Sequence, residues 1–160
     1  MVLHPRVEIR RRRVCAGVLA ALALLLPAAT TGHEGATGIV KARMDLMKSL
    51  GESTKILTAM YGEKIPHESA VVENEARWIA SQAQQIARLF PKGSKDWPSE
   101  ARLEIWQDWP AFRDLAEDLA QKGEQLAKRA ASAPPSETSA DFRALVGICG
   151  SCHKKFREHQ

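Results

Sequence analysis

Residues 139–158 read SADFRALVGICGSCHKKFRE, and they combine an amphipathic helical pattern with a Cys-x-x-Cys-His run. Apolar residues recur here at spacings of three and four, which is the period of one helix face. They are Phe142, Leu145, Cys149, Cys152 and Phe156. The segment therefore predicts a helix over about Ser139 to Glu158 that carries both cysteines on its apolar face.

The run occupies Cys149 to His153. Cys-x-x-Cys-His is the sequence signature for attachment of a c-type haem. Each cysteine sulfur adds across one haem vinyl group, and the histidine that follows reaches the iron. On a helix these residues stand at i, i+3 and i+4, so all three point to one face. The run predicts one covalently bound haem c, with Cys149 and Cys152 as thioether anchors and His153 as the proximal iron ligand.

The N-terminus has the pattern of a secretory signal peptide over residues 1–32. Arg6 and Arg10–Arg13 form a basic segment, Val14–Leu26 is apolar, and small residues follow up to Gly32. This apolar run is shorter than the roughly 20 residues that a membrane-spanning helix needs, although an uncleaved anchor is the alternative. We expect cleavage within residues 28–32, export to the periplasm and no stable membrane anchor.

The cysteine pair has two other interpretations. A Cys-x-x-Cys pair also occurs in thiol–disulfide couples and as half of a zinc site. Zinc needs further ligands nearby, and Cys15, the other cysteine of the chain, lies in the predicted signal peptide. A redox couple of the thioredoxin kind accompanies a βαβ pattern, which the sequence lacks. A helical bundle without haem, closed by a structural disulfide, is the remaining hypothesis.

Charge gives no indication of a nucleic-acid partner. The formal net charge is +4, but five of the 23 Lys and Arg residues and one of the 19 Asp and Glu residues fall in residues 1–32. The predicted mature chain, residues 33–160, therefore has equal numbers of basic and acidic residues. Its length of about 128 residues suits one domain with one core.

The mature chain has the pattern of an all-α protein, since no sustained period-2 alternation is present. The predicted helices cover Thr37–Tyr61, Glu68–Phe90, a short piece at Glu100–Gln107, residues from Pro110 to about Ala130, and Ser139–Glu158. Short connections between four long helices favour an antiparallel four-helix bundle, in which cofactor sites form between facing helices.

The chain resembles the cytochrome c′ family of class II c-type cytochromes. Its haem run lies near the C-terminus, as it does in that family. Val40–Lys48 (VKARMDLMK) is similar to the family pattern on the first helix. Leu89–Ser94 (LFPKGS) and the later Glu104–Trp106 (EIW) are similar to the family's Phe-Pro-x-Gly-Ser and Pro-Glu-Ile-Trp segments. Leu103 stands where the family usually has proline, which is a departure in a loop.

The resemblance implies roles for two residues of the first helix. Arg43 corresponds to the family arginine near the haem propionates, and the alternative for it is an ordinary solvated helix face. Met47 corresponds to the residue on the distal side of the iron, and the alternative for it is simple core packing. If the Met47 sulfur binds iron, the haem is six-coordinate and low-spin. If Met47 only packs there, the haem is five-coordinate with an open apolar pocket.

These implications predict a periplasmic monohaem cytochrome that transfers one electron and is not an enzyme. The alternative function is binding or scavenging of small gases such as nitric oxide. The family resemblance also implies a possible homodimer through the first two helices. The sequence names no redox partner and gives no indication of a nucleic-acid or membrane partner.

Overall fold

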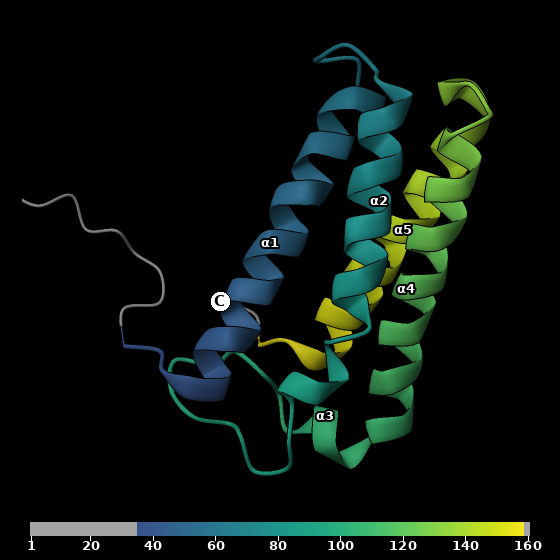
Figure 1. The fold of residues 1–160 in the computed structure, drawn as a ribbon. Coiled ribbons are helices and arrows are strands. Elements are labelled where there is room, and N and C mark those ends of the chain that lie inside the picture. Colours follow the sequence, from purple (N-terminus) through teal and green to yellow (C-terminus); the bar gives the residue numbers. More distant parts are fainter. Residues whose placement is uncertain (1–34, 159–160) are drawn as a thin grey trace, which may run out of the picture. The chain divides into compact units, whose positions relative to one another are not determined.

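The structure is a computed structural model that describes residues 35–158 (Figure 1). The predicted signal peptide, residues 1–32, lies outside the described residues. The elements are α1 (Gly38–Tyr61), α2 (Ser69–Ala83), the 3₁₀ turn η1 (Ala87–Leu89), α3 (Glu104–Gln107), α4 (Trp109–Ala130) and α5 (Pro135–Phe156). The four long helices form a bundle, which confirms the predicted all-α class and four-helix architecture.

The core lies between the four long helices. Its largest fully buried apolar side chains are at most 1% exposed: Leu57, Val72, Ile79, Ile105, Leu126 and Leu145. The helices α2 and α4 approach each other closely at Gly123. A Cβ built on Gly123 lies 2.8 Å from the Ala76 carbonyl oxygen and 2.9 Å from the Ala80 Cβ. Small residues on both helices therefore permit this close packing.

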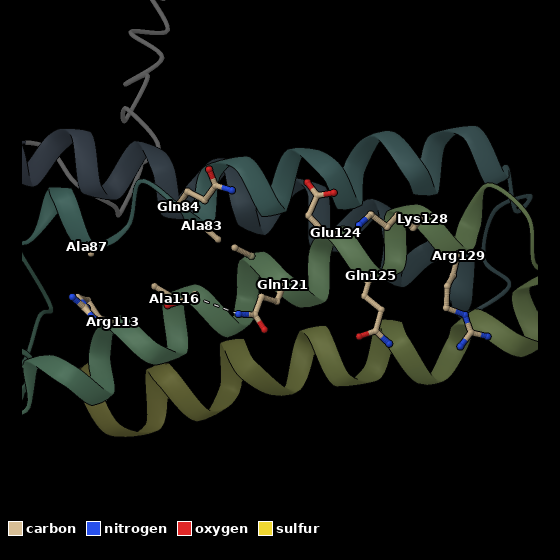
Figure 2. Close-up of a pocket in the computed structure, with 12 residues that line it drawn as sticks. Ala83, Gln84, Ala87, Arg113, Ala116, Gln121, Glu124, Gln125, Lys128 and Arg129 are labelled. Atoms are coloured by element: carbon tan, nitrogen blue, oxygen red, sulfur yellow. Dashed lines mark hydrogen bonds between the residues drawn. The ribbon is translucent and has the colours of Figure 1, made fainter.

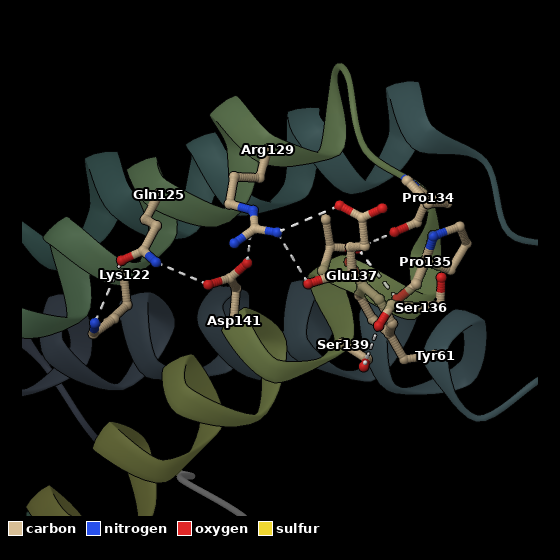
Figure 3. Close-up of polar contacts among 11 residues, drawn as sticks. Tyr61, Lys122, Gln125, Arg129, Pro134, Pro135, Ser136, Glu137, Ser139 and Asp141 are labelled. Atoms are coloured by element: carbon tan, nitrogen blue, oxygen red, sulfur yellow. Dashed lines mark hydrogen bonds and ion pairs between the residues drawn. The ribbon is translucent and has the colours of Figure 1, made fainter.

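A buried carboxylate joins α4 to α5 (Figure 3). Asp141 Oδ1 accepts a hydrogen bond of 2.8 Å from Gln125 Nε2, and Asp141 Oδ2 lies 3.3 Å from Arg129 Nε. Arg129 also donates to the backbone carbonyl of Glu137 at 3.2 Å. Because a buried charge is costly unless it is paired, these partners explain how Asp141 is accommodated in the interface.

The second predicted helix is too long. The helix α2 ends at Ala83, and the chain continues to Phe90 through tight turns and η1. Ile86 N donates to Ala83 O at 3.1 Å, and Leu89 N donates to Ile86 O at 3.0 Å, so the bonds have the i to i+3 spacing of a 3₁₀ turn. Ile86 and Phe90 remain buried. The apolar pattern therefore continues while the hydrogen-bond period changes, and side-chain periodicity does not reveal the change.

The last helix is also displaced relative to its prediction. It begins at Pro135 rather than Ser139, because proline has a suitable φ for the first turn and has no N–H to leave unsatisfied. It ends at Phe156, after which Arg157 is extended and forms an isolated antiparallel bridge with Ala101. Pro134 thus ends the loop after α4, and Pro135 begins α5.

Candidate functional site

The Cys-x-x-Cys-His run lies in the C-terminal half of α5. Cys149 and Cys152 are half-buried, and His153 is exposed at the flank of the same helix face. The Cys149 Sγ lies 3.8 Å from the Leu145 carbonyl oxygen, and both cysteines are free thiols. The intervening Gly150 and Ser151 are exposed. The helix therefore presents two unpaired thiols and one imidazole together, as the sequence predicts.

The environment of the thiols favours their neutral form. Burial raises the pKa of Cys149. Burial, and then the neighbouring Cys149, raise the pKa of Cys152 to about 11. Thiol–disulfide couples and zinc sites act through thiolates, so neutral thiols are the less favourable starting form for either one. Within residues 35–158, no group of three or more His, Cys, Asp or Glu residues is placed to hold a metal ion.

The surroundings of His153 favour the neutral form of its imidazole. Loss of hydration lowers the pKa of His153, and the Arg157 guanidinium lowers it further, while the Glu100 carboxylate acts in the opposite direction. A neutral imidazole has the lone pair that a metal ligand needs.

The rise of the two helices from a shared contact is expected to bring Met47 of α1 to about the level of Cys152 of α5. The helices α1 and α5 run antiparallel, and they meet where Tyr61 donates a 2.9 Å hydrogen bond to Thr138 (Figure 1). Met47 precedes Tyr61 on α1 by the same number of residues as Cys152 follows Thr138 on α5. Both helices rise about 21 Å over this length, because an α-helix rises about 1.5 Å per residue.

The residues around the run fit a covalently bound haem. The donor set is two unpaired thiols and an imidazole on one helix face. Met47, Val146, Cys149 and Cys152 are only partly buried, although all four pack against the apolar core. A Cβ built on Gly51, one turn beyond Met47, meets no atom within 4 Å. The site thus offers apolar side chains with incomplete contacts, which a large planar apolar group would cover.

Arg43 is buried, so the solvated helix face considered for it is wrong. Its side chain is held by the segment that follows α2, and the residue is 4% exposed. The guanidinium donates to Leu89 O, Ser94 O, Ser94 Oγ and Ser99 Oγ at 2.7–3.3 Å. Its Cζ lies 4.0 Å from the centre of the Phe90 ring. Burial lowers the pKa of Arg43, and Asp96 opposes this shift.

No local sequence pattern indicates that these groups are the partners of Arg43. The LFPKGS segment was identified only as a family pattern, yet Leu89 and Ser94 of this segment accept hydrogen bonds from the guanidinium. Ser99 also accepts a hydrogen bond from Arg43, but it belongs to no recognised sequence motif. The predicted contact of Arg43 with haem propionates stays a prediction.

A large groove of the described surface lies away from this run (Figure 2). It has a volume of about 810 Å³ and runs between α4 and the end of α2. Its floor is formed by small side chains, and charged residues such as Arg113, Glu117 and Lys128 line its rim. None of the predicted site residues lines it, so the groove is separate from the Cys-x-x-Cys-His site.

The helices of residues 35–158 include none with the length and apolar character that crossing a membrane requires.

Comparison with known proteins finds similar sequences over most of the chain. The sequence model of the family described as "Cytochrome C'" matches residues 38–157. The chain is 31% identical to cytochrome c′ of Rhodopseudomonas palustris over 76% of this chain and 82% of that protein. It is 27% identical to cytochrome c-556 of Agrobacterium fabrum over 84% of this chain and 91% of that protein.

A solved structure shows the same architecture. Cytochrome c′ from Rhodopseudomonas palustris superposes with a TM-score of 0.73 at 28% identity. The match covers 78% of this chain and 99% of that one. The similarity therefore extends over the whole bundle and includes the helix with the Cys-x-x-Cys-His run.

Proposed function

The chain belongs to the cytochrome c′ family, and on that premise we propose that it transfers single electrons through a haem held by Cys149, Cys152 and His153. Proteins of this family carry a covalently bound haem c. The observation that supports the proposal is that α5 presents two free thiols and an imidazole on one face.

Haem supplies a reversible one-electron couple at its iron. Different residues of the chain would contribute different properties to the haem site. The sulfurs of Cys149 and Cys152 would fix the group to α5, and His153 would offer a ring nitrogen to its iron. Met47 and Val146 exclude water with apolar surface. Burial and ligand identity set the potential of such a site, and a Met/His pair of ligands raises it.

Binding of small gases is the second candidate function. Met47 is half-buried, and its neighbours Leu46 and Leu50 are buried apolar residues. If the Met47 sulfur packs without binding iron, this side is an apolar pocket that admits uncharged diatomic molecules such as nitric oxide. The two candidates therefore differ in what Met47 does.

Substitution of Met47 separates the two candidates. For the electron carrier, we expect the wild-type ferric protein to be low-spin and Met47→Ala to be high-spin, because the variant lacks the sulfur ligand. Optical and paramagnetic resonance spectra measure this change. Met44→Ala is the matched control, since Met44 is another half-buried methionine of α1, and it should leave the spin state unchanged.

The opposite result would identify a gas-binding protein. In that case the wild-type protein is already high-spin, its ferrous form takes up carbon monoxide, and Met47→Ala leaves the spin state as it was. A high-spin wild-type spectrum therefore contradicts ligation by Met47 and favours the second candidate.

We propose that the protein acts in the periplasm, exchanges electrons with a redox partner and forms a homodimer. The predicted signal peptide over residues 1–32 supports export to the periplasm, where a redox protein would exchange electrons with this chain. The family resemblance supports a homodimer through α1 and α2, whose surface includes the exposed Ile56 and Trp78. The proposed role is that of a carrier, with no catalytic step.

A further inference from the structure

We propose that Arg43 is a positioning residue for His153, acting through Ser99 and the segment Glu100–Arg102. The two residues lie on different helices, and a continuous set of hydrogen bonds connects their surroundings. This role rests on the proposed function, in which His153 binds the haem iron.

The first connection is between Arg43 and Ser99. Arg43 Nη1 donates to Ser99 Oγ at 2.8 Å, and the other donors of the guanidinium bind Leu89 and Ser94. All the acceptors are carbonyl or hydroxyl oxygens, and no carboxylate in residues 35–158 forms a salt bridge with Arg43. A planar guanidinium engaged at several acceptors fixes their relative positions more strictly than a lysine ammonium does. The side chain therefore holds the segment after α2 against α1.

The second connection is between Ser99 and the end of α5. Ser99 Oγ also accepts a hydrogen bond of 3.2 Å from the backbone N–H of Ala101. Ala101 forms the isolated bridge with Arg157. On either side of this bridge, Arg102 N donates to Phe156 O at 3.0 Å and Glu158 N donates to Glu100 O at 2.8 Å. The Glu100–Arg102 segment is thus paired with the residues that end α5.

The third connection is between this pairing and His153. The backbone N–H of Arg157 donates to the His153 carbonyl at 3.0 Å, which closes the last turn of α5. Arg157 Nε also donates to Glu100 Oε2 at 2.6 Å. The last carbonyls of a helix have no partners within the helix, so its end frays unless other groups bind there. Loss of the pairing would loosen the turn that orients the His153 ring.

Two serine substitutions in the haem-loaded protein test this role. Ser99→Ala removes the hydroxyl shared by Arg43 and Ala101. Ser94→Ala is the matched control, because it removes another hydroxyl bound by Arg43, one that donates to the Pro91 carbonyl, whereas the Ser99 hydroxyl accepts from Ala101. Hydrogen exchange at the amides of Arg102 and Glu158 is measured by mass spectrometry. We expect about tenfold faster exchange in Ser99→Ala, and less than about twofold in Ser94→Ala.

Electron paramagnetic resonance of the ferric protein supplies the readout at His153. We expect Ser99→Ala to shift the g-values while the coupling of the iron spin to an imidazole nitrogen persists, and Ser94→Ala to leave both unchanged. Equal exchange in the two variants overturns the proposal, as do unchanged g-values with faster exchange. Absence of imidazole coupling in the wild-type protein overturns the proposed ligand itself, and with it this role.

Discussion

Replacing Cys149 and Cys152 together by alanine abolishes covalent attachment of haem. The two thiols are the only described cysteines, and they share one face of α5, so no other described side chain can form the thioether bonds. The purified variant should show essentially no haem stain after denaturing electrophoresis, whereas the wild-type protein retains its stain. Each single variant should keep one thioether and therefore a reduced but measurable stain.

Ser151→Ala is the matched control for the cysteine variants. Ser151 lies within the same run, is exposed, and donates to the Gly147 carbonyl at 2.9 Å. Its loss changes the sequence between the two cysteines without removing a sulfur, so haem staining should equal that of the wild-type protein. Full staining of the double cysteine variant would contradict the assignment of both anchors.

The second large effect is expected at Gly123, where α4 meets α2. A Cβ at this position lies within 3.0 Å of the carbonyl oxygen of Ala76 and of two atoms of Ala80. Because two of these three atoms belong to the backbone, the helices must move apart to admit a side chain. Gly123→Val should lower the free energy of unfolding by about 3 kcal/mol, the range typical of an overpacked core. Thermal unfolding followed by circular dichroism measures the loss, expected to be about 10 °C in Tm.

Gly147→Val provides the comparison for Gly123. Gly147 lies in the exposed part of α5, and a Cβ there meets no atom within 4 Å. Valine is a slightly better helix former than glycine, so this variant should unfold at or slightly above the wild-type temperature. If Gly123→Val and Gly147→Val unfold alike, the close approach of α2 and α4 does not limit the size of residue 123.

The sequence predicted the features that depend on a local pattern. The spacing of Cys149, Cys152 and His153 places them on one helix face, and the structure has them there. The apolar pattern located the four long helices, but it extended the second one to Phe90. Buried side chains at 86 and 90 satisfy that pattern in a 3₁₀ turn as well as in an α-helix, so only the backbone bonds distinguish the two.

The features that the sequence could not provide depend on contacts between distant segments. In the sequence, a glycine inside a helix is expected only to destabilise that helix. The close approach of α2 is what shows that residue 123 must be small. Likewise, a charged residue on an amphipathic helix is most often solvated. Arg43 is buried because carbonyl and hydroxyl groups from a distant part of the chain accept hydrogen bonds from its guanidinium. No local pattern in either segment predicts these hydrogen bonds.

The central claim is that one haem is joined to the chain through Cys149 and Cys152. The most direct measurement is the mass of the tryptic peptide that contains both cysteines, residues 144–154, from the purified wild-type protein. We expect a peptide whose mass includes one haem bound through both sulfurs and whose haem is retained under denaturing conditions. A peptide with two free thiols, or with a disulfide between them, would contradict it.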